Sequence, residues 1–302
     1  MESIMTTASG FFFMIFLGYI LKKRGLFKLE DKDFLGKILL NICLPAVIVM
    51  SFQDFTFDKS LIVAFFIGML ANLGGIFVGY LFSGKSEKEG KALLMFLTAG
   101  YNIGIFTIPF VSSFFSSAAV LAVLMFDVGN AMFVMGITAA IINGLINQEK
   151  GNPIPMILNK MSKSVCIITY VVMLCFIIAK IQVPSIVFSL ANVPASATSF
   201  LAMIMVGIML EFKIKPEEVK ELCSFLVIRY AFSLCVSGLI FVFLPYDIEL
   251  KKALMIGVLS PMSTASMVLA QTMGCKPSLV GGAGTFSILI SMVSIVAISI
   301  YL

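Results

Sequence analysis

The chain has 302 residues, of which 60% are hydrophobic and only 12% are charged, and its mean hydropathy is +1.08. Soluble domains do not have this composition, so we expect the lipid bilayer to surround most of the chain. The net charge of +5 predicts no nucleic-acid partner, because the basic residues lie in short groups between apolar segments. The sequence has no histidine, which excludes an imidazole metal site and a Ser-His-Asp triad, and its six scattered cysteines form no CxxC pair. We therefore predict no metal site and no cofactor.

Apolar segments of membrane-spanning length follow one another along the whole chain. We predict ten transmembrane helices, at 4–21, 36–53, 60–83, 92–114, 118–144, 164–182, 192–211, 222–244, 253–273 and 279–301. The first is followed by Lys22-Lys23-Arg24, whereas a cleaved signal peptide would carry its basic residues in front, so this helix is expected to be retained. The pattern predicts an all-α polytopic membrane protein.

The basic residues alternate between the two sides of these ten segments. Loops after the odd-numbered segments hold sixteen Lys and Arg residues, and the loops on the other side hold four. Because cytoplasmic loops carry the excess of positive charge, the first set is expected in the cytoplasm. The prediction is a multi-pass protein of the inner (cytoplasmic) membrane with both termini facing outside.

Five segments on each side of the connecting loop at 147–163 suggest a duplication of 1–146 in 164–302. With an odd number of helices in each half, the second copy must be inverted. Lys91-Ala-Leu-Leu-Met resembles Lys252-Ala-Leu-Met, and without a gap Tyr101-Asn102 then falls opposite Met262-Ser263.

The fourth and ninth segments carry residues that an ordinary spanning helix has little reason to hold. Between 100 and 110 these are Tyr101, Asn102, Gly104 and Pro109, and in the ninth segment Pro261, Ser263, Thr264 and Ser266. Paired interruptions in matching positions are typical of a transporter's substrate site. The N-terminal ends of the half-helices would favour an anion. The alternative is that the prolines are simple kinks and that Asn102 bonds a neighbouring helix.

Asp127, in the fifth segment, is the most informative charge. An intramembrane carboxylate is costly and functional by default, so it could exchange a proton, coordinate a cation or line the cavity. The alternative is a structural Asp bonded to Asn130 one turn away. Asn72 is a further candidate for the cavity lining. For Arg229, snorkelling to the basic side is favoured over substrate binding.

An ordered set of motifs gives these features a common pattern. They are Asn41-x-x-Leu44-Pro45, Tyr101-Asn-x-Gly-x-x-x-x-Pro109, Asp127-x-Gly-Asn130 and Pro261-Met-Ser-Thr-Ala-x-x-x-Leu-Ala270-Gln. With them the chain resembles the auxin efflux carrier family, which includes plant auxin exporters and bacterial permeases for malate-type acids.

The resemblance implies ten helices in a five-plus-five inverted repeat, similar to bile-acid symporters and sodium-proton antiporters, with broken helices 4 and 9 crossing at mid-membrane. Helices 1, 2, 6 and 7 would form a scaffold, through which a homodimer would associate, and helices 3–5 and 8–10 a moving transport domain. The residue set implied for the substrate adds Asn41, Pro45, Asn72 and Asn130 to those of the two broken helices, with Asp127 for coupling. Asn72 stands where plant members have an acidic residue, which sets this chain apart from their charge arrangement.

These observations predict a secondary carrier of mono- or dicarboxylates, not an enzyme, driven by a gradient of H⁺, Na⁺ or the substrate itself. A sodium-coupled carrier of the bile-acid-symporter type and a membrane ligand sensor without transport are the alternatives. An intramembrane aspartyl protease is rejected, because Asp127 has no second aspartate in another apolar segment.

Overall fold

A computed structural model describes residues 2–53, 58–84, 86–147 and 152–301. Within these ranges the chain forms helices and no strand, and its only sheet-like contact is one isolated antiparallel bridge. The α-helices are α1 Glu2–Lys23, α2 Asp31–Ile38, α3 Leu44–Ser51, α4 Lys59–Phe82, α5 Lys88–Thr98, α6 Ile108–Phe114, α7 Ser117–Met132, α8 Thr138–Ile142, α9 Ile154–Ser162, α10 Val165–Ile178, α11 Ser185–Met209, α12 Val219–Phe243, α13 Ile248–Val258, α14 Thr264–Thr272 and α15 Pro277–Tyr301. Shorter π-helical or 3₁₀ segments are η1 Leu39–Cys43, η2 Ile103–Thr107, η3 Phe133–Ile137, η4 Asn143–Asn147 and η5 Pro216–Glu218.

Six helical stretches in the described part of the chain are long and apolar enough to cross a membrane. They are Asp31–Ser51, Lys59–Phe82, Ser117–Ile146, Ser185–Met209, Pro216–Phe243 and Pro277–Tyr301. A seventh span is possible from α9 and α10 together, which are bent by 70° relative to each other. The prediction of an all-α, multi-pass membrane protein is therefore confirmed at this coarser level.

Four predicted spans are not among these six stretches. The segments predicted at 92–114 and 253–273 are each two helices separated by a break, α5 from α6 with η2, and α13 from α14. The span predicted at 164–182 is the 14-residue helix α10. The first predicted span lies within the continuous helix α1.

The connection predicted at 147–163 contains a short helix, α9. Pro155 stands in the first turn of α9, where its missing N–H leaves no bond unmade. Ile157 is buried against Gly136 of η3. Residues 148–151 of this connection lie outside the described residues.

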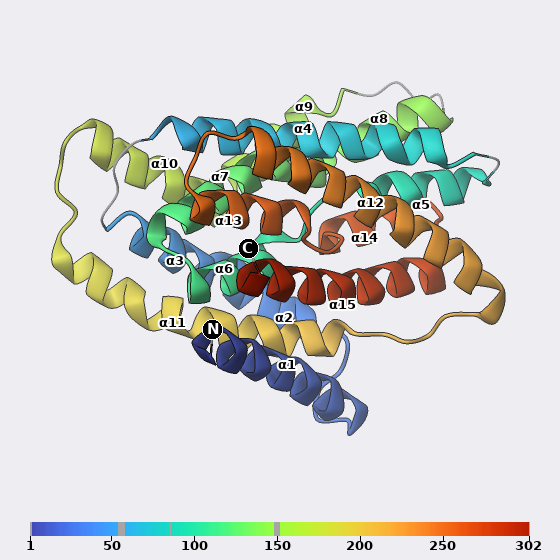
Figure 1. Cartoon of the computed structure of the whole chain (residues 1–302), viewed down its shortest axis with the longest axis horizontal. Coiled ribbons are helices and arrows are strands. Elements are labelled where there is room, and N and C mark those ends of the chain that lie inside the picture. Colours follow the sequence, from blue (N-terminus) through green and yellow to red (C-terminus); the bar gives the residue numbers. More distant parts are fainter. Residues whose placement is uncertain (1, 54–57, 85, 148–151, 302) are drawn as a thin grey trace.

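The helices pack in two groups. α1, α2, α3, α10 and α11 contact one another, and α4, α5, α7, α12, α13 and α15 form a second set of mutual contacts. Most long helices run roughly along the longest axis (Figure 1). The α4–α5 and α11–α12 connections lie at one end of this axis, and the α10–α11 connection lies at the other (Figure 1).

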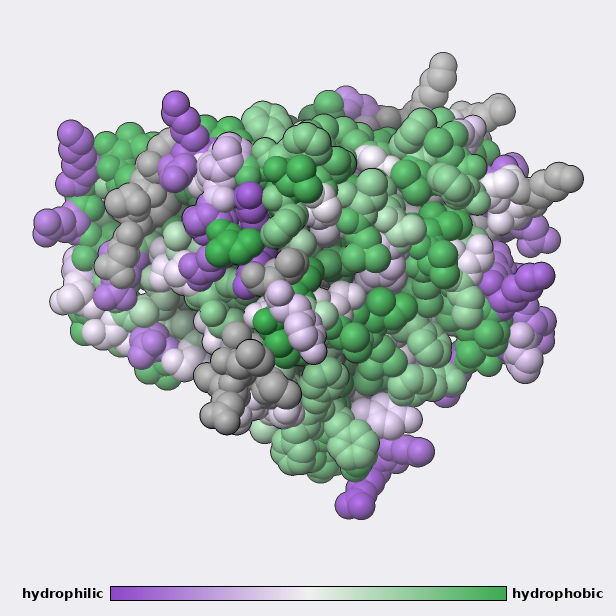
Figure 2. All heavy atoms as spheres, viewed as in Figure 1, coloured by the Kyte–Doolittle hydropathy of each residue, from purple (hydrophilic) through white to green (hydrophobic). Residues whose placement is uncertain are grey.

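The outer surface is apolar over the middle of the molecule. Large hydrophobic side chains near the middle of long helices, such as Leu70 on α4, Leu234 on α12 and Phe200 on α11, are exposed. On the face seen in Figure 2, hydrophilic residues gather mainly toward the two ends of the long axis. This distribution suits a protein whose long axis crosses a bilayer.

Candidate functional site: the crossing of two broken helices

Both broken helices stop at residues that disfavour a continuous helix. α5 ends at Thr98, and Gly100 then adopts a φ of +76°, a conformation that glycine takes without strain. α13 ends at Val258, three residues before Pro261, and α14 begins at Thr264. A side chain at Gly100 would also meet Ser266 of α14, since an added Cβ would lie 2.2 Å from the Ser266 Oγ.

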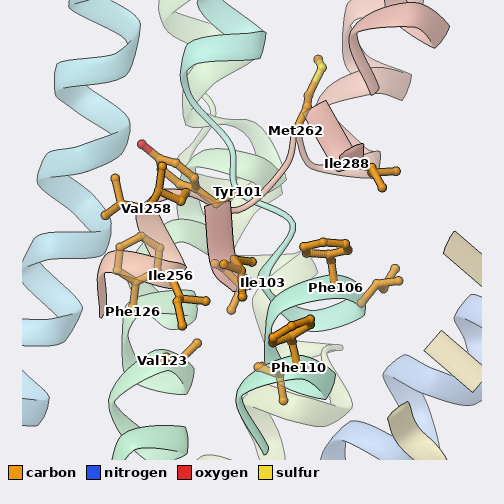
Figure 3. Packing of buried hydrophobic residues seen from close by; sticks show 14 of the residues in the cluster. Tyr101, Ile103, Phe106, Phe110, Val123, Phe126, Ile256, Val258, Met262 and Ile288 are labelled. Atoms are coloured by element: carbon orange, nitrogen blue, oxygen red, sulfur yellow. The ribbon is translucent and has the colours of Figure 1, made fainter. Parts of the chain in front are cut away.

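The two breaks are joined by a reciprocal pair of backbone hydrogen bonds. The Asn102 N–H donates to the Pro261 carbonyl at 2.9 Å, and the Ser263 N–H donates to the Gly100 carbonyl at 3.0 Å. Tyr101 and Met262 face each other in the isolated bridge between these bonds. Tyr101 and Met262 are also the positions that the gap-free alignment of the two halves makes equivalent. The side chains of Tyr101, Phe126 and Val258 lie on one side of the crossing, and those of Phe106 and Phe110 on another (Figure 3).

Two asparagines satisfy the free backbone groups of the first break. The Asn72 Oδ1 accepts from the Gly100 N–H at 2.8 Å, and the Asn130 amide bonds both the N–H and the carbonyl of Tyr101, at 3.0 and 2.9 Å. The Asn72 Nδ2 also donates to the Asn130 Oδ1 at 3.2 Å. Buried backbone polar groups need such partners, so both amides hold the break in place.

The second break has a different set of partners. Arg229 of α12 donates from Nη2 to the Ser260 carbonyl. On α15, the Ser287 hydroxyl accepts from the Met262 N–H at 3.2 Å, and the Ser291 hydroxyl donates to the Leu259 carbonyl. The two breaks thus share a backbone arrangement but differ in charge, since neutral amides support the first and a guanidinium supports the second.

Arg229 does not lie where the sequence suggested. Its side chain is 0% exposed, so it does not snorkel to the basic side, and that interpretation is wrong. The reason is local: α12 packs beside the break, and the unpaired Ser260 carbonyl attracts the guanidinium.

A cavity of about 220 Å³ opens beside the crossing. Seven of the predicted site residues line it: Tyr101, Asn102, Gly104, Asp127, Asn130, Ser263 and Thr264. The remaining walls come mainly from apolar residues of η1, α3, α7 and α10. Such a space, mostly apolar with a few converging polar groups, is typical of a small-molecule site.

Two residues that line this cavity carry hydrogen-bond donors without a partner. The Asn102 Nδ2 and the Tyr170 hydroxyl are buried and unpartnered in the described structure. The first N–H groups of α14, at Thr264 and Ala265, follow the break and have no preceding turn to bond. Together these groups offer donors and a positive helix end to an anionic or carbonyl-bearing ligand.

Asp127 is the carboxylate of the cavity. Its Oδ1 accepts from the Asn130 Nδ2 at 2.9 Å, which is the contact that the alternative structural interpretation of Asp127 predicts. Cys166 and Tyr170 of α10 are the titratable groups that face it. Asp127 therefore has a structural partner and also borders the ligand space.

The other predicted residues do not line this cavity. Asn72, Pro261 and Ser266 are part of the crossing itself or its support: Asn72 is 0% exposed, the Pro261 carbonyl accepts from Asn102, and the Ser266 hydroxyl lies against Gly100. Pro109 lies farther along, and its carbonyl accepts from Ser199 of α11 at 2.8 Å.

The motif of the second predicted span, Asn41-x-x-Leu44-Pro45, lies in η1 and the start of α3. Pro45 stands in the first turn of α3, directly after the π-helical η1. Asn41 is exposed, bonds the Lys37 carbonyl at 2.8 Å, and lines a second, wider space.

Sequence reasoning missed the contribution of α10. Cys166 and Tyr170 line the cavity, although nothing in their apolar surroundings in the sequence points to the crossing. The available signal was a tyrosine in the middle of an apolar span, where its hydroxyl needs a partner that lipid cannot provide.

The wider space adjoins the cavity and leads toward one end of the molecule. It measures about 710 Å³ and shares Leu40, Ile105, Thr264 and Ala265 with the cavity. Lys32, Lys37 and Glu211 stand on its wall. A separate pocket of about 320 Å³ is lined by residues of α3, α6, α7 and α11, among them Ser113 and Ser199. There Ser199 bonds Ser113 at 2.9 Å and joins α11 to α6.

Compared with known proteins, the chain matches no protein-family model and no curated sequence.

Proposed function

We propose that this chain is a secondary transporter of small organic anions, with mono- or dicarboxylates as its substrates. The observation that supports this most is the crossing itself. Two interrupted helices meet inside an apolar bundle, and Asn102 and Tyr170, which line the adjoining cavity, each carry an unpartnered donor. A carboxylate can accept from these donors and from the free end of α14 without a tight ion pair, which would hold the cargo too long.

The proposal includes a ten-span arrangement with an inverted repeat. The reciprocal bonds at the crossing support it, because Asn102 and Ser263 donate to Pro261 and Gly100 in a two-fold pattern. The resemblance to auxin efflux carriers supports the same arrangement. In this proposal both termini lie outside the cytoplasmic membrane, and the Lys-rich end of the molecule lies inside.

We also propose that the two helix groups move against each other. The group of α1, α2, α3, α10 and α11 would be the scaffold, and the group of α4, α5, α7, α12, α13 and α15 would carry the crossing. The wide space at the Lys32 and Lys37 end supports an inward-open state. At the opposite end, Ser199 of α11 bonds the Pro109 carbonyl of α6, which packs on α7 of the second group, and this bond would have to break in the outward-open state.

Asp127 is proposed to couple transport to a cation. Ionised, it would repel an anion in the shared cavity; neutralised by a proton or a bound Na⁺, it would not. A gradient of H⁺ or Na⁺ could then drive the cargo, as could the gradient of the substrate.

The test is uptake of radiolabelled malate into proteoliposomes under imposed pH or Na⁺ gradients. Saturable uptake is expected for the wild type and for Asn159→Ala, a control at an exposed position on α9. Asn102→Ala should lose most of it, because the unpartnered Nδ2 is removed from the cavity. If protons couple, Asp127→Asn should abolish the response to pH; a Na⁺ requirement would favour the sodium-coupled carrier. Specific binding without any carboxylate transport would refute the carrier and favour a sensor.

A further inference from the structure

Arg229 is a buried cation that the proposed carrier leaves without a role. It lies within α12, and its side chain is 0% exposed. Nη2 donates to the Ser260 carbonyl, but Nε and Nη1 have no hydrogen-bond partner in the described structure. Removing an unpaired guanidinium from water costs free energy, and one kept inside a membrane domain is a functional residue by default.

The surroundings of Arg229 leave its charge uncancelled. The guanidinium carbon lies 5.4 Å from the ring centroid of Tyr101 and 5.8 Å from that of Tyr230. Both rings offer cation–π contacts, which stabilise the charge without neutralising it. Tyr101 also borders the cavity beside the crossing, so Arg229 lies directly behind one of the cavity's wall residues.

We propose that Arg229 is a fixed counter-charge for the cargo, an inference that rests on the proposed transport function. It offsets the negative charge of a carboxylate bound at the crossing, and it does so through space, without contacting the ligand. Arg229 is thus a positioning and selectivity residue that favours anions over uncharged analogues. At a separation on the order of 10 Å and an effective dielectric constant of about 20, one unit charge changes anion affinity by about tenfold.

A purely structural role makes a different prediction. If Arg229 only donates a hydrogen bond to the Ser260 carbonyl, another side chain with an N–H donor can replace it. Arg229→Gln should then behave like the wild type. If the charge matters, Arg229→Lys should retain the wild-type behaviour, while Arg229→Gln and Arg229→Met should resemble each other. Arg229→Met also leaves the Ser260 carbonyl without its donor, so it should be less stable than Arg229→Gln, and the binding comparison is made on the fraction that folds.

The first measurement compares binding of malate with binding of its uncharged diamide in the purified full-length protein. In Arg229→Gln and Arg229→Met, malate affinity should fall about tenfold, and diamide affinity should stay the same. Equal losses for both ligands, or unchanged malate affinity, would overturn the inference. If both uncharged variants fail to fold while Arg229→Lys folds, Arg229 is a structural cap and the inference is also overturned.

The second measurement is exchange of labelled malate across proteoliposomes with equal malate on both sides, under potentials set by K⁺ and valinomycin. The dependence of exchange on potential gives the charge that moves with the loaded carrier. This charge should differ by one unit between wild type and Arg229→Gln, and it should be the same in wild type and Arg229→Lys. The same potential dependence in all three would overturn the inference and leave the carrier intact. A wild type that exchanges nothing would instead refute the proposed function.

Discussion

Replacing Gly100 with alanine tests the geometry of the crossing directly. Gly100 combines two demands, a φ of +76° and a close approach of Ser266, whose Oγ would lie 2.2 Å from an added Cβ. The backbone conformation costs an alanine about 1–2 kcal/mol, and overpacking adds about 1–3 kcal/mol. Together they predict a loss of about 2–5 kcal/mol in the free energy of unfolding.

A matched control separates these two contributions. Gly274, in the loop after α14, has a φ of +82° and nothing within 4 Å of an added Cβ, so Gly274→Ala should cost only the backbone part. Ser266→Ala should be nearly neutral alone, because its hydroxyl has no partner, and it should restore most of the packing loss in Gly100→Ala.

The assay is the temperature at which half of the detergent-solubilised protein survives heating as a monodisperse peak in size-exclusion chromatography. Gly274→Ala should lower it by a few degrees and Gly100→Ala by clearly more, since about 1 kcal/mol corresponds to roughly 2–4 °C in a chain of this size class. Equal losses at the two glycines, or no rescue by Ser266→Ala, would refute the close approach of the two broken helices.

Three further outcomes follow from the site. Asn130→Ala should destabilise the protein by about 3 kcal/mol or more, because it leaves the Tyr101 N–H and carbonyl unpaired, whereas Asn102→Ala removes an unpartnered amide and should barely change the same heating curve. Cys166 lines the cavity, so a water-soluble thiol reagent should modify it in membranes and malate should slow that reaction, with Cys166→Ser as the control; modification unaffected by malate would contradict a shared site. In the α14–α15 loop, burial, and then the nearby Glu89, raises the pKa of Cys275 from 9.0 to about 11. Because the folded state holds this proton more tightly, its contribution to stability is fully present below pH 9 and is lost as the pH rises through about 11. Iodoacetamide labelling of Cys275, followed by peptide mass spectrometry, should therefore keep increasing between these pH values in the folded protein but level off near pH 9 in the unfolded chain.

The sequence was most informative where local chemistry decides the backbone. Gly100, Asn102 and Pro261 break helices for reasons that need no tertiary contact, and Tyr101 and Met262, the positions that the alignment of the halves makes equivalent, meet in the bridge. What the sequence could not supply is the depth and rotation of each helix. Arg229 was placed near the basic side by counting turns, but the break in α13–α14 offers it a carbonyl in the interior.

Asn72 is a second residue whose role could not be read from the sequence. A polar residue in an apolar helix predicts either a ligand contact or a structural bond, and the pattern alone does not separate the two. Its amide makes bonds to Gly68, Gly100 and Asn130, so its hydrogen-bonding capacity is used within the protein. Tyr170 is the converse case, since its apolar surroundings in the sequence conceal a hydroxyl that lies unpartnered in the cavity.

In the proposed carrier, the difference between the two breaks accounts for anion binding at the crossing. A perfectly symmetric crossing would place equal partners on both sides, and two amide-supported breaks would leave a carboxylate facing Asp127 without any compensating charge. Here neutral asparagines support the break next to Asp127, and the cation supports the other. In the proposed carrier the cavity thus has Asp127 on its wall and the charge of Arg229 against its wall residue Tyr101, and a bound carboxylate is favoured most when Asp127 is neutralised. Charge asymmetry on a two-fold backbone thus links cargo binding to the state of Asp127, and an Arg229→Gln, Asp127→Asn double variant should lose both anion preference and coupling while keeping the crossing intact.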